Sequence, residues 1–188
     1  EKSKVEIFFD YIKVGFEHII PKGWDHIVFV LGLFFFSNKL RPLIWQISAF
    51  TFAHTVTLAL GSMGYVKIVP EIVEPLIALS IVFIAVENIF IRNLSKWRPL
   101  VIFVFGLLHG LGFASVLGEF GLPSGFFTPA LLGFNVGVEF GQLTVVLLAF
   151  IFVGYWFNSK NYYSSSIAKP ISAIIGLVGA YWFIERII

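Results

Sequence analysis

The chain has 188 residues and a formal net charge of +2, and it contains no cysteine. Hydrophobic residues make up 58% of it and charged residues 13%, against roughly 45–50% and about 25% in soluble domains. This composition excludes an ordinary soluble domain, disulfides and thiolate metal sites, and the small, scattered charge argues against a nucleic-acid partner. We therefore expect residues 1–188 to form a single integral membrane domain.

The N-terminal segment, residues 1–20, has an amphipathic pattern. Apolar residues such as Phe8 and Phe16 are set against charged residues such as Asp10. A helix with this pattern typically lies in the membrane interface, with its apolar side toward the acyl chains. Pro21 then predicts the end of the helix. We expect an N-terminal amphipathic interfacial helix.

Six apolar segments follow, separated by loops rich in proline, glycine, serine, asparagine and charge. They are residues 24–37, 43–64, 75–91, 100–118, 129–157 and 171–184. Most approach the roughly 20 residues that a transmembrane helix needs, and they lack the strict alternation of a transmembrane β-strand. The predicted fold class is all-α: a bundle of six transmembrane helices preceded by the interfacial helix.

Basic residues fall in alternate loops between these segments. They are Lys39, Arg41, Arg92, Lys96, Arg98, Lys160 and Lys169. Cytoplasmic loops of membrane proteins carry an excess of lysine and arginine. The pattern therefore predicts a multi-pass protein with both termini outside, and it requires that the short first segment also crosses the membrane.

Ionisable side chains are few in these segments, and all four histidines of the chain lie in or just before them. They are His18, Asp25, His26, His54, Glu87, His109 and Glu139. Such residues cost a few kcal/mol or more at the bilayer centre, so they should face the bundle interior with a partner. Because no lysine or arginine lies within the predicted spans, the carboxylates would need a proton, a histidinium or a metal cation.

The depth of these residues follows from their distance to the nearest loop. At 1.5 Å per residue, His54 and His109 lie roughly 14–17 Å from one face of the membrane. Glu87 and Glu139 lie roughly 15–18 Å from the other face. We therefore predict a midplane set of these four residues. A separate outer set would stand above it, near the mouth: His18, Asp25 and His26.

Other polar residues share helical faces with this group. Asn135, Glu139 and Gln142 stand at i, i+4 and i+7, and Thr51 and His54 stand at i and i+3, so each set lies on one side of its helix. We expect five supporting polar residues: Asn135, Gln142, Thr51, Ser80 and Asn88.

Glycines recur beside two of the ionisable residues. Gly133, Gly137 and Gly141 repeat every four residues around Glu139, and Gly106 and Gly110 flank the His109 position. Small residues at this spacing let helix backbones approach closely. We expect tight helix contacts at both places.

Five segments together resemble the HupE/UreJ family of bacterial membrane proteins. They are HIIPKGWDH at 18–26, FAHTVTL at 52–58, AVEN at 85–88, FGLLHGLGFA at 105–114 and FNVGVEFGQ at 134–142. Their order extends over nearly the whole chain. The resemblance implies a nickel or cobalt permease of the bacterial inner membrane, often tied to hydrogenase or urease maturation.

The resemblance also implies which residues handle metal. In the family, a first-helix histidine, an Asp-His motif and a later histidine motif have this role, and here they would be His18, Asp25, His26, His54 and His109. Glu87 and Glu139 join them on the depth argument alone. Six residues separate His18 from Asp25, a longer spacing than in the nickel-permease branch. The chain therefore resembles a second branch of the family.

We predict a permease for a divalent transition-metal ion of the nickel, cobalt or zinc type, because imidazole with carboxylate suits these ions. One alternative is an intramembrane metal-dependent hydrolase acting on lipid or a membrane-bound peptide, although the chain lacks a motif such as HExxH. Another is a proton-relay or assembly subunit without metal. We expect transport rather than catalysis and assign no catalytic residue. The expected partners are lipid and the metal ion, and a homo-oligomer is left open.

Overall fold

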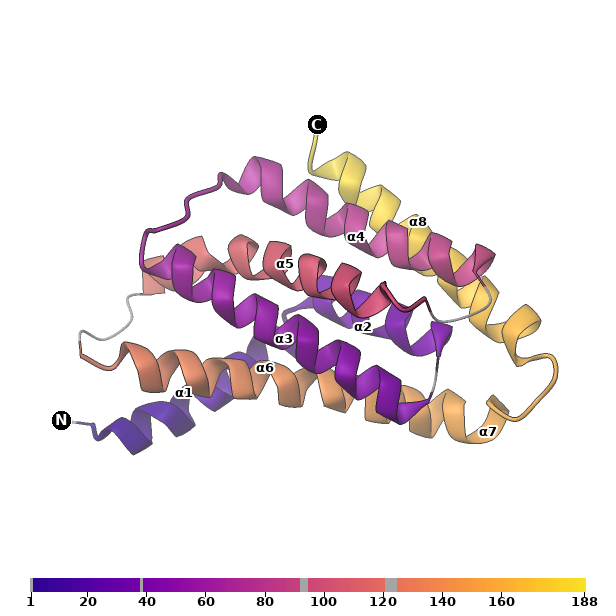
Figure 1. Ribbon diagram of the computed structural model, residues 1–188, viewed down its shortest axis with the longest axis horizontal. Coiled ribbons are helices and arrows are strands. Elements are labelled where there is room, and N and C mark those ends of the chain that lie inside the picture. Colours follow the sequence, from indigo (N-terminus) through magenta and orange to yellow (C-terminus); the bar gives the residue numbers. More distant parts are fainter. Residues whose placement is uncertain (1, 38, 92–94, 121–124) are drawn as a thin grey trace.

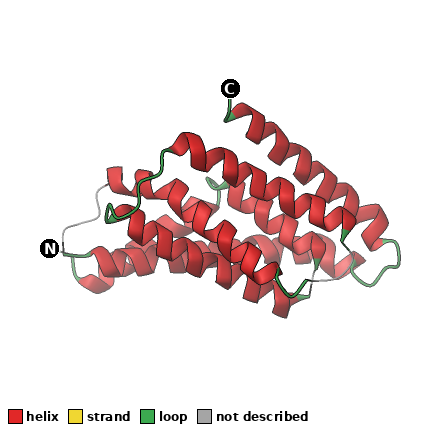
Figure 2. Cartoon of the chain, turned by 45° about the horizontal axis from the view of Figure 1, so that its top comes forward, coloured by secondary structure: helices red, strands yellow, loops and turns green. Residues whose placement is uncertain are grey.

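The computed structural model describes residues 2–37, 39–91, 95–120 and 125–188, with the side chains of residues 115–120 excepted. Within these ranges every regular element is helical (Figure 2). The helices are α1 (Lys4–Ile19), α2 (Trp24–Phe36), α3 (Leu40–Ser62), α4 (Pro70–Phe90), α5 (Arg98–Phe120), α6 (Phe127–Ala149), the π-helix η1 (Phe150–Gly154), α7 (Tyr155–Phe157), the π-helix η2 (Ser164–Ala168) and α8 (Lys169–Glu185).

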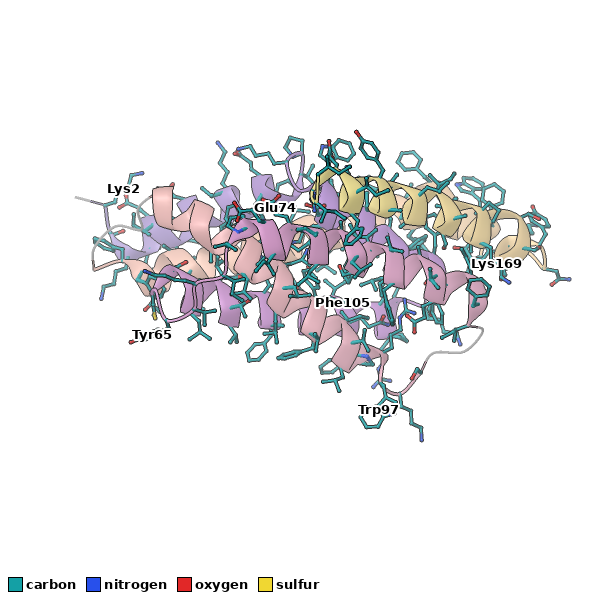
Figure 3. The ribbon with its side chains drawn as sticks, turned by 90° about the horizontal axis from the view of Figure 1, so that it is seen from above. Lys2, Tyr65, Glu74, Trp97, Phe105 and Lys169 are labelled. Atoms are coloured by element: carbon teal, nitrogen blue, oxygen red, sulfur yellow. The ribbon has the colours of Figure 1, made fainter. Side chains whose placement is uncertain are left out.

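The long helices run along the long axis of the molecule, and their connections alternate between its two ends (Figure 1). The α3–α4 and α5–α6 connections share one end with the N-terminus, and the α2–α3, α4–α5 and α7–α8 connections share the other. Lys2 and Tyr65 mark the first end and Trp97 and Lys169 the second (Figure 3). We refer to them as the Tyr65 end and the Lys169 end.

Four helices are long and apolar enough to cross a membrane: α3, α4, α6 with its continuation to Phe157, and η2 with α8. Helices α1 and α2 pass the same test only as a pair, and they are bent by 73° at the break between them. Residues 98–114 of α5 count as a shorter apolar helix. The chain is thus a multi-pass membrane protein with four to five candidate spans by this test, and the predicted count of six is not confirmed.

Helix boundaries differ from the prediction chiefly at the N-terminal ends. Helix α4 begins at Pro70, whereas proline at position 75 had marked the predicted start. Proline lacks an N–H and is tolerated in the first turn, where that N–H would have no helical partner. Pro75 lies inside α4, so this proline does not mark a boundary. Arg92, one of the basic loop residues, lies outside the described residues.

Helix α1 lies along α6 and belongs to the bundle. A Cβ atom at Gly15 would lie 1.9 Å from the carbonyl oxygen of Phe134, and one at Gly137 would lie 2.1 Å from that of Ile12. Such distances leave room only for glycine, so the two backbones are in direct contact. The glycine repeat of α6 therefore packs against the segment for which we expected an interfacial position, and that position is not confirmed.

Helices α3 and α5 also pack closely through glycine. A Cβ atom at Gly110 would lie 2.3 Å from the carbonyl oxygen of His54, and one at Gly106 would lie 2.4 Å from that of Phe50. The glycines that flank His109 thus bring its helix against the helix of His54. This contact places His54 of α3 and His109 of α5 on adjacent turns of the two packed helices.

Candidate metal site

The four histidines of the chain come together in the bundle interior. One ring nitrogen each from His18, His26 and His54 lies within 4.8 Å of the other two. The ring of His109 lies beside them, with its centroid 4.9 Å from that of His26. We refer to these four residues as the histidine cluster. Nitrogens at this spacing can ligate one ion with small side-chain movements.

The break between α1 and α2 makes this cluster possible. His18 is in the last turn of α1 and His26 in the first turn of α2, and their ring centroids are 5.0 Å apart. Eight residues of continuous helix would separate the two by roughly 12 Å along the axis. At the break, a Cβ atom on Gly23 would lie 2.4 Å from the carbonyl oxygen of His18. The chain turns tightly there and returns His26 to the level of His18.

The predicted separation into an outer and a midplane set is therefore wrong for the histidines. The prediction placed His18 and His26 above His54 and His109, because depth was counted from loops along straight, separate helices. In the structure α2 follows α1 after a bend of 73°, and the break lies between the two ends of the bundle rather than at one of them (Figure 1). The residues on both sides of it reach the level of His54.

Asn135 fixes the orientation of the His54 ring. The Asn135 amide Nδ2 donates to the carbonyl of Leu131 at 2.8 Å, which leaves Oδ1 to face His54 Nδ1 at 3.2 Å. Because Oδ1 can only accept, the Nδ1 atom of His54 must carry the hydrogen. The Nε2 atom then holds a lone pair, as a metal ligand requires.

Ser80 has the same effect on His109. Its hydroxyl donates to the carbonyl of Ile77 at 2.7 Å, and its oxygen lies 3.3 Å from His109 Nε2. The serine oxygen therefore accepts from Nε2–H, and the lone pair of His109 lies on Nδ1. Asn135 and Ser80 were predicted as supporting polar residues on the faces of Glu139 and Glu87, and in the structure they contact His54 and His109.

Each histidine presents a buried nitrogen that has no hydrogen-bond partner among the described residues. These atoms are Nε2 of His18, Nε2 of His26, Nε2 of His54 and Nδ1 of His109. Buried polar atoms are rarely left unpaired, because the desolvated group then loses its interaction with water. Four unpaired imidazole nitrogens in one place fit a divalent transition-metal ion, which imidazole binds through such a lone pair.

A cavity of about 310 Å³ adjoins the cluster. It is lined by His18, Lys22, Gly23, Asp25, His26, Glu74, Ile77, His109, Gly112, Phe113 and Arg186. Lys22 and Glu74 are exposed, whereas His26 and His109 are buried. The cavity therefore leads from a charged rim to the imidazoles.

On the opposite side the cluster is closed by phenylalanine rings. Phe29, Phe50 and Phe105 each lie three or four residues from a cluster histidine, one turn toward the Lys169 end. The ring centroid of Phe29 is 5.1 Å from that of Phe50 and 6.0 Å from that of Phe105. We refer to these three rings as the aromatic floor. Among the described residues, these rings cover the side of the cluster that faces away from the cavity.

Glu87 does not join the cluster. Its carboxylate accepts a hydrogen bond from Arg98, and both side chains are buried. Glu87 lies two turns beyond Ser80 on α4, roughly 10 Å further along the axis. The expectation that carboxylates within the spans lack a basic partner is wrong here. Arg98 was assigned to a loop, but it begins α5 and its side chain is 1% exposed.

The Arg98 side chain connects several helices at the Lys169 end. Its Nε donates to Gln46 Oε1 on α3 at 3.1 Å, and its guanidinium carbon lies 3.9 Å from the ring centre of Phe36. Asn88, predicted as a supporting residue, donates from Nδ2 to the carbonyl of Gly32 at 2.8 Å and to Ser172 at 3.0 Å. These contacts make Asn88 part of a structural network away from the cluster.

Glu139 lies on the contact between α3 and α6. Its Oε1 accepts from Ser48 at 2.7 Å, and Gln142 on the same side of α6 accepts from Thr51 at 2.9 Å. The predicted stripe of α6 is therefore a row of hydrogen bonds to α3 that continues from the Asn135–His54 pair. Glu139 is not in the three-histidine group.

Asp25 lines the cavity but is paired with a residue that the sequence did not indicate. Arg186, just after α8, donates from Nη2 to both carboxylate oxygens at 2.9 and 3.1 Å. The two residues are 161 positions apart, and no spacing rule connects such positions. Glu74, also far from Asp25 in the sequence, was missed for the same reason. Arg98 stands before a proline, which is a signal for a first helical turn.

No curated protein and no solved structure matches the chain. The family described as HupE / UreJ protein matches residues 1–186, all but the last two positions. The match includes every residue of the histidine cluster and of the cavity wall. The chain therefore belongs to the HupE / UreJ protein family.

Proposed function

We propose that the protein moves a divalent transition-metal ion of the nickel, cobalt or zinc type across the bacterial inner membrane, with the histidine cluster as its binding site. The observation that carries the proposal is the group His18, His26 and His54: one ring nitrogen of each lies within 4.8 Å of the other two, and each ring has a buried Nε2 without a partner in the described residues. Neutral imidazoles are common ligands of these ions, and the family is linked to nickel and cobalt handling.

The proposed topology has six crossings with both termini outside. The α1–α2 pair would be one broken crossing rather than an interfacial helix followed by a short span. Its support is the alternation of the connections between the two ends (Figure 1) and the basic residues Lys39, Lys96 and Lys160 in the connections at the Lys169 end. Broken helices recur in transporters, because irregular backbone is tolerated where it lines a site inside the protein.

In this scheme the ion enters from the Tyr65 end through the cavity and loses water to the imidazoles. Onward movement requires the aromatic floor to open, since Phe29 and Phe50 are buried against the cluster. Loading and release would then take place in two different conformations, as alternating access requires.

The first test is metal content and metal transport. Purified protein should retain about one ion of Ni²⁺, Co²⁺ or Zn²⁺ per chain, and proteoliposomes should take that ion up. His26→Ala and His54→Ala should abolish both, while Thr144→Ala is the matched control, because its hydroxyl bonds only to its own helix in the structure. Uptake that persists in both histidine variants would contradict the proposal.

Topology is tested separately, and the chain's lack of cysteine makes this simple. Single variants Lys67→Cys and Lys160→Cys carry one thiol at each end of the bundle. In intact cells a membrane-impermeant maleimide should label position 67 and leave position 160 unlabelled until the membrane is opened. The reverse pattern would place the cavity on the cytoplasmic side.

A second function, a metal-dependent hydrolase, is favoured by one observation. Three histidine nitrogens face one point, and a cavity with exposed Glu74 lies next to it. Catalytic zinc commonly uses three protein ligands and leaves one position for water, with a carboxylate nearby as general base. Glu74→Gln should abolish hydrolysis of a lipid or peptide substrate yet leave ion uptake intact. Uptake without any hydrolytic activity in wild-type protein would reject this alternative.

A further inference from the structure

We propose that Arg186 is an internal competitor of the metal ion for Asp25, so that metal capture requires Asp25 to exchange the guanidinium for the ion. This inference rests on the proposed metal site. It assigns a role to the C-terminal end of α8, which the motifs of the chain do not include. Arg186 would set the affinity of the site rather than bind the ion.

Arg186 spans the cavity between two helices. Its Nη2 donates to both oxygens of Asp25 at the start of α2, at 2.9 and 3.1 Å. Its Nη1 donates to the backbone carbonyl of Glu74 on α4 at 3.0 Å. The Asp25 carboxylate, which directly precedes cluster residue His26, therefore already has a cationic partner.

The charges of the cavity wall explain why this pair matters. Lys22 and Arg186 are cations, Asp25 and Glu74 are anions, and neutral histidines add nothing, so the wall has no net charge. A divalent ion on three imidazoles would bring two uncompensated positive charges into a partly buried site. Unpaired charge in such a place is costly. The ion therefore needs a carboxylate, and Asp25 is the one that adjoins the cluster in sequence and lines the same cavity.

Arg186 is placed so that it can withdraw. Helix α8 ends at Glu185, so Arg186 lies beyond its last turn, and its side chain is 19% exposed. Besides Asp25 and the Glu74 carbonyl, its guanidinium carbon faces the Trp182 ring at 5.6 Å. A guanidinium leaving Asp25 can enter water at the rim of the cavity, where Lys22 and Glu74 are exposed. Asp25 keeps a cationic partner before and after the exchange.

The exchange predicts whether each substitution tightens or weakens metal binding. Arg186→Gln leaves Asp25 without its partner and gives the cavity wall a net negative charge, so the metal should bind more tightly, by about tenfold or more. Arg186→Lys keeps the charge and should change affinity far less. Asp25→Asn removes the group for which the two cations compete, so adding Arg186→Gln to it should bring a clearly smaller gain than in wild type, from the charge of the cavity wall alone.

The experiment measures the dissociation constant of Ni²⁺ or Co²⁺ by equilibrium dialysis. It compares wild type, Arg186→Gln, Arg186→Lys, Asp25→Asn and the Asp25→Asn/Arg186→Gln double variant. The expected result is tighter binding in Arg186→Gln, weaker binding in Asp25→Asn and a smaller gain from Arg186→Gln in the Asp25→Asn background than in wild type. Circular dichroism and size-exclusion chromatography check that each variant is folded and monodisperse.

Two results would overturn the inference alone: wild-type or weaker affinity in folded Arg186→Gln, or the same gain in affinity from Arg186→Gln in the Asp25→Asn background as in wild type. Absence of bound metal from wild type and every variant would overturn the proposed function and this inference with it.

Discussion

At the residue scale, two of the buried histidines, His54 and His109, are oriented by a hydrogen bond on one ring nitrogen. Asn135 holds His54 through Nδ1, and Ser80 holds His109 through Nε2. Different nitrogens are held in the two rings, yet each retains an unpaired atom. The two supports therefore select the tautomer that can bind a cation.

These supports give the first prediction. Asn135→Leu and Ser80→Ala should weaken metal affinity by roughly 10- to 100-fold, the usual cost of losing such a partner. Isothermal titration of each variant measures the change. Thr144→Ala again serves as control, since its hydroxyl donates only to the Phe140 carbonyl in the structure. Unchanged affinity in both variants would show that the rings need no external orientation.

Sequence alone singled out all four histidines that the structure brings together: three because an ionisable side chain inside an apolar segment is conspicuous, and His18 through the 18–26 motif. The sequence did not show that the four side chains lie at the same level along the bundle. Depth was counted from the nearest loop, and this count fails where a helix breaks inside the bundle, as it does between His18 and His26. The partners of the carboxylates were also hidden: Glu87 is bound by Arg98 and Asp25 by Arg186, and tertiary contacts of this kind leave no periodic pattern.

At the scale of elements, the contact between α1 and α6 holds one half of the site in place. The Gly137 position meets the carbonyl oxygen of Ile12, and Ile19, next to His18, is fully buried. The amphipathic pattern of α1 is equally suited to a membrane interface and to a helix with one covered face, so the sequence could not separate the two. The glycine repeat indicated a close contact but not its partner.

The second prediction concerns this contact. Gly137→Leu should push α1 away from α6, lower the melting temperature in detergent and weaken metal binding, because His18 moves with α1. Thermal unfolding and metal titration of the same sample measure both effects. Val136→Leu is the matched control, because Val136 directly precedes Gly137 and is 36% exposed. A lower melting temperature with unchanged metal affinity would show that His18 does not contribute to metal binding.

The third prediction concerns the network of Arg98. Arg98→Gln leaves the buried carboxylate of Glu87 unpaired and should lower the free energy of unfolding by about 3–5 kcal/mol. Adding Glu87→Gln removes that unpaired charge and should restore part of the loss. Denaturant unfolding in detergent compares the two, with Lys96→Gln, an exposed neighbour, as control. A double variant less stable than Arg98→Gln would argue against charge pairing as the cause.

At the scale of the whole molecule, the alternation of basic loops anticipated the alternation of the connections in Figure 1. That agreement has a simple origin, because loop charge and hydrophobic length are properties of contiguous sequence. The arrangement of helices around the cluster depends on contacts such as α1 with α6 and α3 with α5, between segments far apart in the chain. Family membership and hydropathy therefore gave the class of fold, while the placement of the site required the structure.

The aromatic floor has an electrical consequence. If water fills the cavity above it, the transmembrane voltage falls mainly across the apolar layer and only partly above the ion. An ion arriving from outside has then already moved through a share of the field when it binds. For a divalent cation the full field is worth about 4.6 kcal/mol per 100 mV. If about one third of the field lies above the bound ion, the corresponding free energy is about 1.5 kcal/mol. That amount would tighten binding about tenfold.

Binding itself, and not transport alone, should therefore respond to voltage. In proteoliposomes with a potassium diffusion potential of about 100 mV, negative inside, outward-facing sites should bind Ni²⁺ or Co²⁺ about tenfold more tightly than at zero potential. Protein in detergent should match the zero-potential value. Affinity that is the same at both potentials would mean that the ion has crossed none of the field. In an energised cell, the rings beneath the histidines would let the resting potential load the site before any helix moves.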